Sequence, residues 1–576
     1  MTYALATIRT WFDLLQSTIA PQALLDAAQR LKMPAIGVVD HATTLGHVPL
    51  AKAARETGVH VAYGATITLD DGHPLRLLAR NEVGYGNLCR LVTFQAQGQV
   101  RLPWQTLHDH RAGLYLLCGG RHGRLWHTLA AGDDRVLWLL ARLVALAERE
   151  DAFVIEAQQI PGDGPAEHRT LRALLDLAAH AGVRAIATHE VQVLQPAESP
   201  KHRLVAAIDH QLTFWAEDQR LPPWRAREPS RVALPEPRDW HRTWEGLEHL
   251  VAGSAALLRD CQVELLGRRR FPGASLSAAR IYDDLWSRAF SGLKQRYGQV
   301  RPDLIQRLTH EVDEVQAQEV GPFLLYAAEL VERAAERGIK MVLQGSGTGS
   351  LLCYALGISP VDPLTTEALV FERFCGRHRG IGDLPDLDFG VPAGKERAVR
   401  ALLEEMFGAE RVAFLAAVVT LQERGAIRTA ASAFGWDRQQ IRLLHRKLKA
   451  GEPLDRYEQM VVSAGEQIAG QPYHLMRHPS GVIVAEEPLA SLYAVGTCSD
   501  GPMLLANKDD VEALQLLKFD ILPWYLLAIY DQAEASIHAA QYPRPDLWHV
   551  PGTDDRTGDM LEQADTRCIP YLQSPA

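Results

Sequence analysis

Short apolar runs alternate with amphipathic stretches over roughly the first 265 residues of this 576-residue chain. Runs such as 35–39 and 185–188 predict strands, and the stretches between such runs have helical spacing. This alternation is typical of βα units on a mostly parallel sheet. A Pro- and Arg-rich stretch near 221–238 then predicts a loop. The first half of the chain therefore predicts an α/β fold.

The pattern changes near residue 281, where apolar residues at three- and four-residue spacing predict helices up to Gly338. A run at 340–343 predicts a strand, and the glycine-rich stretch 344–350 leads from it into a helix start at 351–356. Glycine permits tight turns and close approach to a ligand, and a helix N-terminus offers N–H groups to phosphate. No Gly-Lys-Ser/Thr follows, so this is not a Walker loop. A glycine-rich helix entry without a ligand explains the stretch equally well.

Three aspartates provide the strongest candidate chemistry. Asp386 and Asp388 are two residues apart, so on a strand both side chains would point to one face of the sheet. Asp520, placed on a neighbouring strand, would complete a site for hard divalent cations. Two-metal phosphoryl transfer requires such a site, because the ions clamp the attacking and leaving oxygens. The alternative for each aspartate is a turn or helix N-cap.

Composition narrows the possible classes of protein. The hydrophobic fraction of 47% is ordinary for a globular protein, and no stretch is apolar enough to span a bilayer. The seven cysteines form no Cys-x-x-Cys pair, which indicates reduced thiols and a cytoplasmic protein, and the chain start has no secretion signal.

The net charge of −10 argues mildly against a nucleic-acid partner, although a whole-chain charge hides local stripes. Between residues 411 and 450 only Glu423 and Asp437 oppose a set of basic side chains, and the charge count alone favours a solvated helix surface over a nucleic-acid-binding face. The basic set is Arg411, Arg424, Arg428, Arg438, Arg442, Arg446, Lys447 and Lys449.

Six ordered motifs resemble the alpha subunit of bacterial DNA polymerase III, a C-family polymerase. They are 345–358, 361–364, 371–374, the Pro-Asp-x-Asp of 385–388, the His-x-x-Gly-Val stretch of 478–484, and 507–512 leading into 517–520. The resemblance implies a DNA-directed DNA polymerase acting in replication or error-prone repair. Thr420 and Arg428 have the short spacing of the error-prone branch.

The resemblance also implies roles for individual residues. Asp386, Asp388 and Asp520 would be the catalytic residues and would hold two Mg²⁺ ions. Gly345, Ser346 and Lys518 would bind the dNTP. The residues expected to bind primer-template DNA are Arg424, Arg428, Arg442, Arg446 and Lys447. Other replication or translesion proteins are expected as partners, and a membrane is not.

The implied fold is α/β and multidomain. Residues 1–265 resemble a PHP domain, a distorted (β/α)7 barrel, on the strength of the stretch 81–92. Residues 266–420 and 500–535 would form a palm of the polymerase-beta nucleotidyltransferase type. Residues 421–499 would be a helical thumb-like insertion, and 536–576 would begin the fingers.

The PHP-like region departs from the family at its metal ligands. The first His-x-His falls on Thr7 and Arg9, the glutamate expected after Gly64 is Thr66, and the late Asp-x-His falls on Glu190 and Gln192. Only Asp40 and His41 survive. Thr, Arg and Gln cannot replace imidazole and carboxylate ligands, so we expect no metals here and structural roles for Asp40 and His41. A PHP phosphoesterase is therefore the third hypothesis.

The palm region also departs from the family. Gln344 replaces an arginine, so a positive charge near the phosphates is missing. Gly390 replaces a third acidic residue, and 522–524 reads Leu-Pro-Trp in place of Leu-Gly-Leu. The chain also ends early in the fingers, near 571–576, with no clamp-binding motif. A second hypothesis is therefore a catalytically impaired, truncated homologue that acts as an accessory or scaffold protein in replication or repair.

Overall fold

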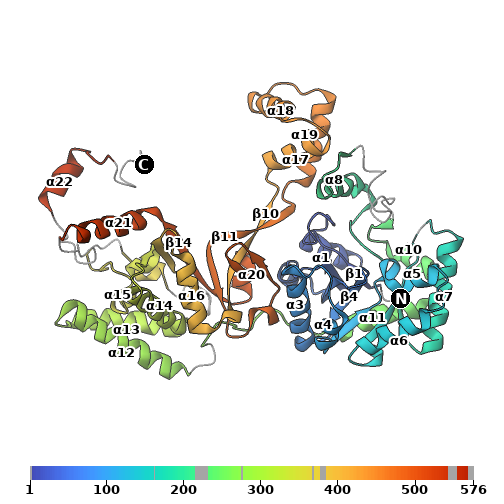
Figure 1. Cartoon of the computed structure of the whole chain (residues 1–576), viewed down its shortest axis with the longest axis horizontal. Helices are drawn as coiled ribbons and strands as arrows, with labels where there is room; N and C mark the ends of the chain where they lie inside the picture. The colour runs from blue at the N-terminus through green and yellow to red at the C-terminus, as the bar shows by residue number, and fades with distance from the viewer. Residues whose placement is uncertain are drawn as a thin grey trace. The chain divides into compact units, whose positions relative to one another are not determined.

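The chain forms two compact units in the computed structural model, whose elements are labelled in Figure 1. Unit 1 comprises Met1–Arg268, Ala413–His478 and Glu487–Leu514, and unit 2 comprises Arg269–Val412, Pro479–Glu486 and Gln515–Ala576. The structure describes residues 3–160, 162–214, 231–273, 277–365, 369–375, 385–541 and 554–567.

Unit 1 contains a seven-stranded sheet whose strands follow their order in the chain. The strands are β1 (Leu5–Ile8), β2 (Ala35–His41), β3 (His60–Thr68), β4 (Pro74–Ala79), β5 (Leu114–Leu117), β6 (Phe153–Ala157) and β7 (Arg184–Ala187). Pairing is parallel except on both sides of β4, which is antiparallel to β3 and β5. A parallel bridge from Ile8 to Val191 curls the sheet back onto its first strand. The predicted seven-stranded, distorted PHP-like barrel is therefore confirmed.

Helices cover this sheet. They are α1 (Pro21–Arg30), α2 (His47–Thr57), α3 (Glu82–Ala96), α4 (Trp104–Asp109), α5 (Arg124–Ala130), α6 (Val136–Leu146), α7 (Pro165–Ala181), α8 (Ser199–Asp209), α10 (Pro237–Thr243) and α11 (Glu248–Asp260). The loop predicted at 221–238 lies mostly outside the described residues, and its last two residues begin α10.

The stretch 81–92 that carries the PHP resemblance is explained by local packing. Asn81 caps α3, with its side-chain oxygen accepting a hydrogen bond from the Gly84 amide at 3.0 Å. A Cβ at Gly84 would lie 1.9 Å from the carbonyl oxygen of Gly113, so only glycine fits there. Tyr85 is buried, and its hydroxyl lies 3.2 Å from Nδ1 of His47. The motif therefore fixes α3 against the barrel.

Unit 1 also contains the helices of the predicted thumb. These are α17 (Glu423–Ala433), α18 (Arg438–Ala450) and α19 (Arg456–Ile468), between β10 (Val412–Thr420) and β11 (Pro472–Val484). Leu421, Ala426, Ala430 and Ile468 share a buried apolar cluster with Leu204 of α8, so α17 and α19 pack on the barrel's last part. The remaining elements are β12 (Val495–Cys498), β13 (Gly501–Leu504) and α20 (Lys508–Ala513).

Unit 2 is built on the strand order β11-β14-β9-β8. Its other strands are β8 (Val342–Gln344), β9 (Asp388–Pro392) and β14 (Leu517–Trp524), and its helices are α12 (Ala278–Tyr297), α13 (Pro302–Ala317), α14 (Gly321–Glu336), α15 (Leu351–Ala355), α16 (Glu396–Phe407), α21 (Tyr525–Ala539) and α22 (Asp555–Glu562). β9 is parallel to β14, while β8 and β11 are antiparallel to their neighbours. The predicted helical region 281–338 and the mixed α/β palm are confirmed.

The predicted domain boundaries at 265, 420, 499 and 535 stay predictions, because compact units and family domains divide a chain on different grounds. Among the helices that the structure describes, none has both the length and the apolar composition needed to cross a membrane.

Candidate active site

The structure brings two of the three predicted aspartates side by side. Asp388 is the first residue of β9, and Asp520 of β14 is its register partner in the parallel pair. Laterally paired residues point to the same face of a sheet, so the two carboxylates are neighbours. Asp386 lies two residues before Asp388 and is exposed. In the described part of the chain, no three acidic, histidine or cysteine side chains are already arranged as a metal cluster.

The electrostatics of the pair follow from this register. Burial raises the pKa of Asp388, the charges of Asp520 and Asp386 raise it further, and Lys518 opposes them. The Asp520 side chain is buried and engaged at both oxygens. Oδ1 accepts a hydrogen bond from the Ser480 hydroxyl at 2.8 Å, and Oδ2 forms an ion pair with the Lys518 ammonium. Lys518 is thus a cation in direct contact with the pair.

Ser480 is a site residue that the sequence reasoning missed. It lies in β11 next to Gly481, which is the register partner of Asp520 in the antiparallel pair. The sequence of 478–484 resembles a family motif, but its spacing alone does not reveal that the Ser480 hydroxyl reaches a carboxylate on another strand.

The three glycines of the turn Gly345–Gly349 have different roles. Gly345 has φ of +71°, and a Cβ on it would lie 3.7 Å from Oδ2 of Asp388, so it faces the carboxylate pair. A Cβ at Gly347 would meet Leu343 at 2.9 Å, and one at Gly349 would meet the backbone of Val370 at 3.1 Å. Gly347 and Gly349 therefore lie in tightly packed surroundings. Gly345 and the half-buried Ser346 remain the predicted nucleotide-binding residues.

The helix start at 351–356 is not free to bind phosphate, which agrees with the alternative of a glycine-rich helix entry without a ligand. The amides of Leu351 and Leu352 donate hydrogen bonds to the buried carboxylate of Glu311, at 3.1 and 2.8 Å. The Ser350 hydroxyl donates to the same carboxylate at 2.8 Å. The protein's own carboxylate therefore occupies the position that a phosphate would take.

Gln344 occupies the place where the resemblance implies an arginine. It is the register partner of Asp388 on β8, and its Nε2 is buried without a hydrogen-bond partner among the described residues. A Cβ at Gly390 would lie 2.8 Å from this Nε2 and 2.9 Å from the Trp524 ring. Gln344 and Trp524 thus fill the space above Gly390, where the family carries its third acidic residue.

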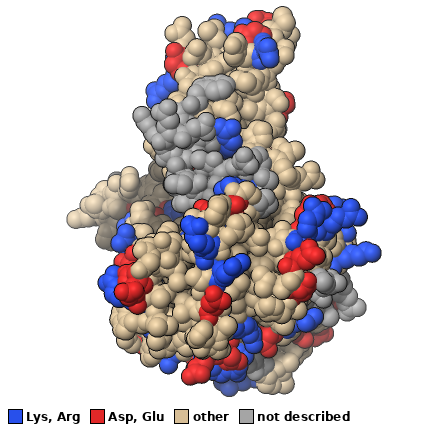
Figure 2. Space-filling model, turned by 90° about the vertical axis from the view of Figure 1, so that its right-hand side faces the viewer, with Lys and Arg blue, Asp and Glu red and all other residues tan. Residues whose placement is uncertain are grey.

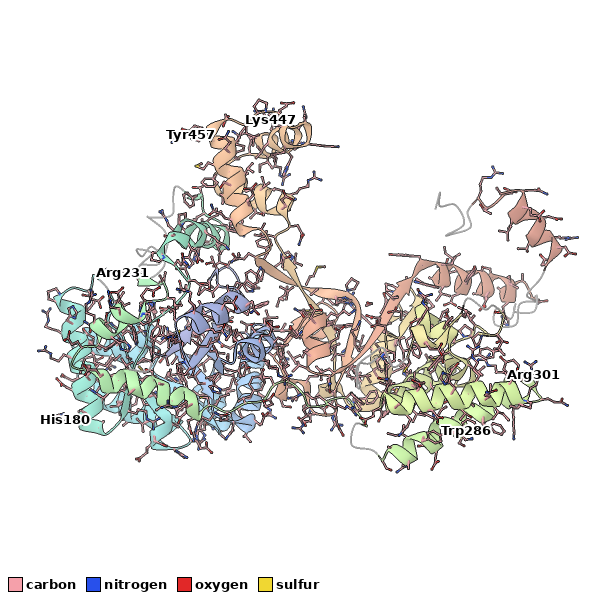
Figure 3. All side chains as sticks on the ribbon, turned by 180° about the vertical axis from the view of Figure 1, so that it is seen from behind. His180, Arg231, Trp286, Arg301, Lys447 and Tyr457 are labelled. Carbon is pink, nitrogen blue, oxygen red and sulfur yellow. The ribbon has the colours of Figure 1, made fainter. Side chains whose placement is uncertain are left out.

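The predicted DNA-binding residues lie on α17 and α18. Arg424, Arg428, Arg442 and Arg446 are exposed. Burial lowers the pKa of His445, and the charges of Arg424 and Arg428 lower it further, so the arginines of α17 face α18. Lys447 differs, because its ammonium lies 2.7 Å from Glu458 of α19. Figure 3 shows Lys447 near the outer end of these helices, and Figure 2 shows acidic and basic side chains interspersed on the face turned to its viewer.

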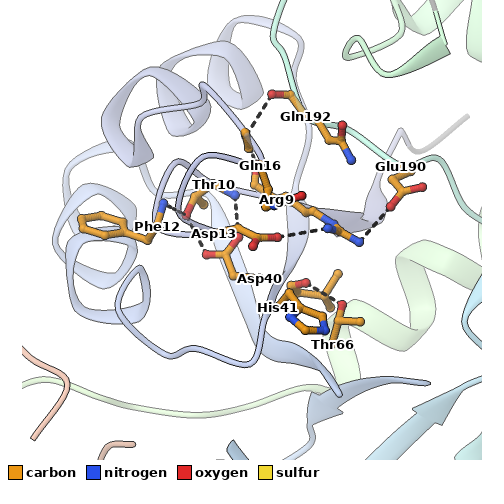
Figure 4. A network of polar contacts seen from close by, with 12 residues as sticks. Arg9, Thr10, Phe12, Asp13, Gln16, Asp40, His41, Thr66, Glu190 and Gln192 are labelled. Atoms are coloured by element: carbon orange, nitrogen blue, oxygen red, sulfur yellow. Dashed lines mark hydrogen bonds and ion pairs between the residues drawn. The ribbon is translucent and has the colours of Figure 1, made fainter. Parts of the chain in front are cut away.

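The residues at the former PHP metal positions form a network of alternating charges (Figure 4). Arg9 bridges Asp13 at 3.1 Å and Glu190 at 2.9 Å. Glu190 also contacts Arg76 at 3.3 Å, and Arg76 contacts the fully buried Glu156 at 2.6 Å. Two guanidinium groups therefore already balance the carboxylates at this end of the barrel, beside a cavity of about 1010 Å³.

The surviving pair Asp40 and His41 is held by protein groups. The backbone and hydroxyl of Thr10 both donate to Asp40 at 2.6 Å, and burial, with Asp13 nearby, raises the pKa of Asp40 to about 8. His41 Nε2 lies 3.1 Å from the Thr68 hydroxyl. Because Arg9, Thr7 and Thr66 replace ligands, these residues do not fit a metal cluster.

Comparisons with known proteins agree with this geometry. Residues 283–523 match the family model for the bacterial DNA polymerase III alpha NTPase domain, and residues 7–159 match that for the PHP domain. Error-prone DNA polymerase 1 of Agrobacterium fabrum is 26% identical over 100% of this chain and 53% of its own length. DNA polymerase III subunit alpha of Bacillus subtilis is 25% identical with the same coverages.

A third relative, an error-prone DNA polymerase of Symbiobacterium thermophilum, is 27% identical over 97% of this chain and 55% of its own length. This chain thus spans about half the length of the curated relatives it matches. The two matched domains lie in the order of the predicted PHP-like and palm regions, and the second includes all three aspartates and the glycine turn. Over its whole length the chain is thus similar to bacterial DNA polymerase III alpha subunits and error-prone DNA polymerases, with a PHP domain and a DNA polymerase III alpha NTPase domain matched in that order.

Proposed function

We propose that this chain is a DNA-directed DNA polymerase that adds nucleotides to a primer by two-metal catalysis. The observation that carries the proposal is the register pairing of Asp388 with Asp520 inside the matched palm domain. Burial and neighbouring negative charge raise the pKa of Asp388, which is the electrostatic cost that a bound cation would remove. Carboxylate oxygens are also the donors that Mg²⁺ prefers.

The residues have distinct roles in this proposal. Asp386, Asp388 and Asp520 would hold two Mg²⁺ ions, which supply charge stabilisation to the phosphoryl transfer. Ser480 orients Asp520 through its hydrogen bond to Oδ1. Gly345 and Ser346 bind the triphosphate, and Lys518 adds positive charge. The exposed arginines of α17 and α18 bind primer-template DNA.

Primer extension by the full chain with Mg²⁺ or Mn²⁺ tests the proposal. We expect extension by the wild type and a loss of at least about 10³-fold in the Asp386→Ala/Asp388→Ala variant, because electrostatic stabilisation is often the largest catalytic contribution. Asp109→Asn, at an exposed position of unit 1, is the control and should extend normally. Extension that survives the double substitution would refute the assignment.

The second candidate, an accessory or scaffold protein without turnover, is favoured by two specific features. Asp520 is engaged at both oxygens, and the family's arginine is Gln344. A wild type that binds primer-template DNA but extends it with neither metal would support this candidate. The PHP phosphoesterase ranks third because the Arg9 network replaces its metal ligands.

We further propose that the chain acts on the error-prone, damage-tolerant side of its family and in the cytoplasm. The short spacing between Thr420 and Arg428 supports this branch, as do the names of two of the relatives described above. Extension past an abasic template position, compared with extension on an undamaged template, tests the branch.

A further inference from the structure

Arg307 and Glu311 lie one turn apart on α13 and hold the segment that follows the glycine turn. Glu311 is fully buried and accepts four hydrogen bonds: from the Ser350 hydroxyl, the Leu351 and Leu352 amides, and Nε of Arg307 at 3.0 Å. Arg307 also donates from Nη2 to the carbonyl oxygen of Gly349 at 2.8 Å. The two side chains thus contact four consecutive residues, 349–352.

Burial of the Glu311 carboxylate costs free energy, which hydrogen-bond donors or a cation must compensate, and Glu311 has both. Burial still raises the pKa of Glu311 above its ordinary value. The carboxylate sits at the N-terminus of α15, so it excludes other anions from these amides. A triphosphate is thereby left with the start of the turn, at the exposed Gly345 and the half-buried Ser346.

The residues that Arg307 and Glu311 contact, 349–352, belong to the same stretch of chain as the turn beside the carboxylate pair. The Ser350 hydroxyl oxygen accepts a hydrogen bond from the Cys353 amide at 3.1 Å, which fixes the start of α15. Gly347 packs on Leu343 and Phe374, and Gly349 packs on the Val370 backbone. The other end of the turn is held by the sheet, because Gln344, the residue before Gly345, is the register partner of Asp388, and Gly345 faces Oδ2 of Asp388. Arg307 and Glu311 therefore fix the later end of a turn whose first end is fixed beside the aspartates.

We propose that Arg307 and Glu311 are positioning residues that hold the glycine turn for the triphosphate of an incoming nucleotide. This inference rests on the proposed polymerase function. Neither residue touches the nucleotide. They act by fixing 349–352, so that the Gly345–Ser346 backbone meets the triphosphate beside Asp388 at low entropic cost.

Two variants of the full chain, Glu311→Gln and Arg307→Lys, test the proposal. Gln keeps the shape of Glu311 but removes its charge, and Lys keeps the charge of Arg307 but cannot reach both Glu311 and Gly349 with a planar fork. We expect the KM for dNTP to rise about tenfold, because misplaced groups lose part of their orientation advantage. The kcat and the Kd for primer-template DNA should stay close to the wild-type values.

A matched control is available on the neighbouring helix α14. Glu329 and Arg333 form an i, i+4 ion pair at 2.6 Å, and both side chains are partly exposed. Glu329→Gln removes the same charge and should leave the KM for dNTP unchanged.

Hydrogen–deuterium exchange provides a readout that does not depend on activity. Peptides covering 345–356 should exchange faster in both variants than in the wild type or in Glu329→Gln. In Glu311→Gln the carboxamide offers the Leu351 and Leu352 amides one acceptor oxygen in place of two, and in Arg307→Lys the bonds to Glu311 and to the Gly349 carbonyl cannot both form. An active wild type whose KM for dNTP is unchanged in both variants would overturn the proposal. So would unchanged exchange over 345–356, even if the wild type proves inactive and the polymerase assignment itself fails.

Discussion

Position 390 illustrates how a single residue determines what the active face can hold. Gly390 lies two residues beyond Asp388 on β9. Because glycine has no side chain of its own, Gln344 and the Trp524 ring pack over the strand at this position. We predict that Gly390→Ala lowers the stability of unit 2 by about 1–3 kcal/mol, because the new methyl group overpacks against a rigid indole. Thermal unfolding of the full chain measures the effect.

Two further variants separate this cause from a general glycine effect. Gly390→Ala/Trp524→Leu should recover most of the lost stability, because the ring that the methyl group meets is gone. Gly558→Ala on α22, where a Cβ would meet nothing within 4 Å, should be neutral or slightly stabilising. If the double variant is no more stable than Gly390→Ala, the overpacking explanation is wrong.

The helices α17 and α18 carry the prediction about DNA. Arg424, Arg428, Arg442 and Arg446 are exposed, whereas Lys447 is already paired with Glu458. We predict that replacing the four arginines by glutamine weakens binding to duplex DNA and reduces the slope of log K against log salt by about 0.9 per lost phosphate contact. Lys447→Gln should change the slope least. Fluorescence anisotropy over a salt series measures both.

If the quadruple arginine variant keeps the salt slope of the wild type, these helices present a solvated surface and do not bind DNA. The count of basic and acidic residues between 411 and 450 favoured that interpretation.

The same elements show where sequence reasoning succeeds and where it stops. The prediction that Asp388 and Asp520 lie on neighbouring strands agrees with the register of β9 and β14, whereas Asp386 lies before β9 begins and does not share the strand that its i, i+2 spacing predicted. Spacing could not reveal Glu311, because it reaches Leu351 and Leu352 from a helix forty residues earlier, or that Arg9 would face Glu190 from across the barrel. Such contacts depend on tertiary packing, which leaves no periodic signal in the chain.

At the scale of the whole molecule, unit 1 contains buried titratable groups with opposite effects on stability. Burial lowers the pKa of both His47 and His189 to about 4 from the ordinary 6.5. Burial raises the pKa of Asp510 to about 7 and that of Asp40 to about 8 from the ordinary 3.8. Each group shifts the free energy of unfolding by about 1.4 kcal/mol per pH unit between its folded and unfolded pKa values.

The signs decide the shape of the pH profile. The histidines bind fewer protons when folded, so their contribution to stability is lost as the pH falls from 6.5 towards 4. The aspartates bind more protons when folded, so theirs is lost as the pH rises from 3.8 to 7 or 8. Between pH 4 and 6.5 the two pairs cancel. Above pH 6.5 only the aspartates act, and we predict a loss of about 2–3 kcal/mol by pH 8.

Thermal unfolding at pH 5, 6.5 and 8 checks this profile, and two substitutions separate its limbs. Asp40→Asn keeps an acceptor for the Thr10 amide and should remove most of the loss between pH 6.5 and 8, because Asp40 titrates over that whole interval. His47→Gln removes one histidine from the acidic limb, so the remaining aspartates should make this variant gain stability from pH 6.5 to 5. Asp26→Asn, at an exposed position on α1, should reproduce the wild-type profile. An Asp40→Asn profile identical to the wild type would show that Asp40 stays ionised inside the barrel, and that the Thr10 donors and Arg9 outweigh its burial.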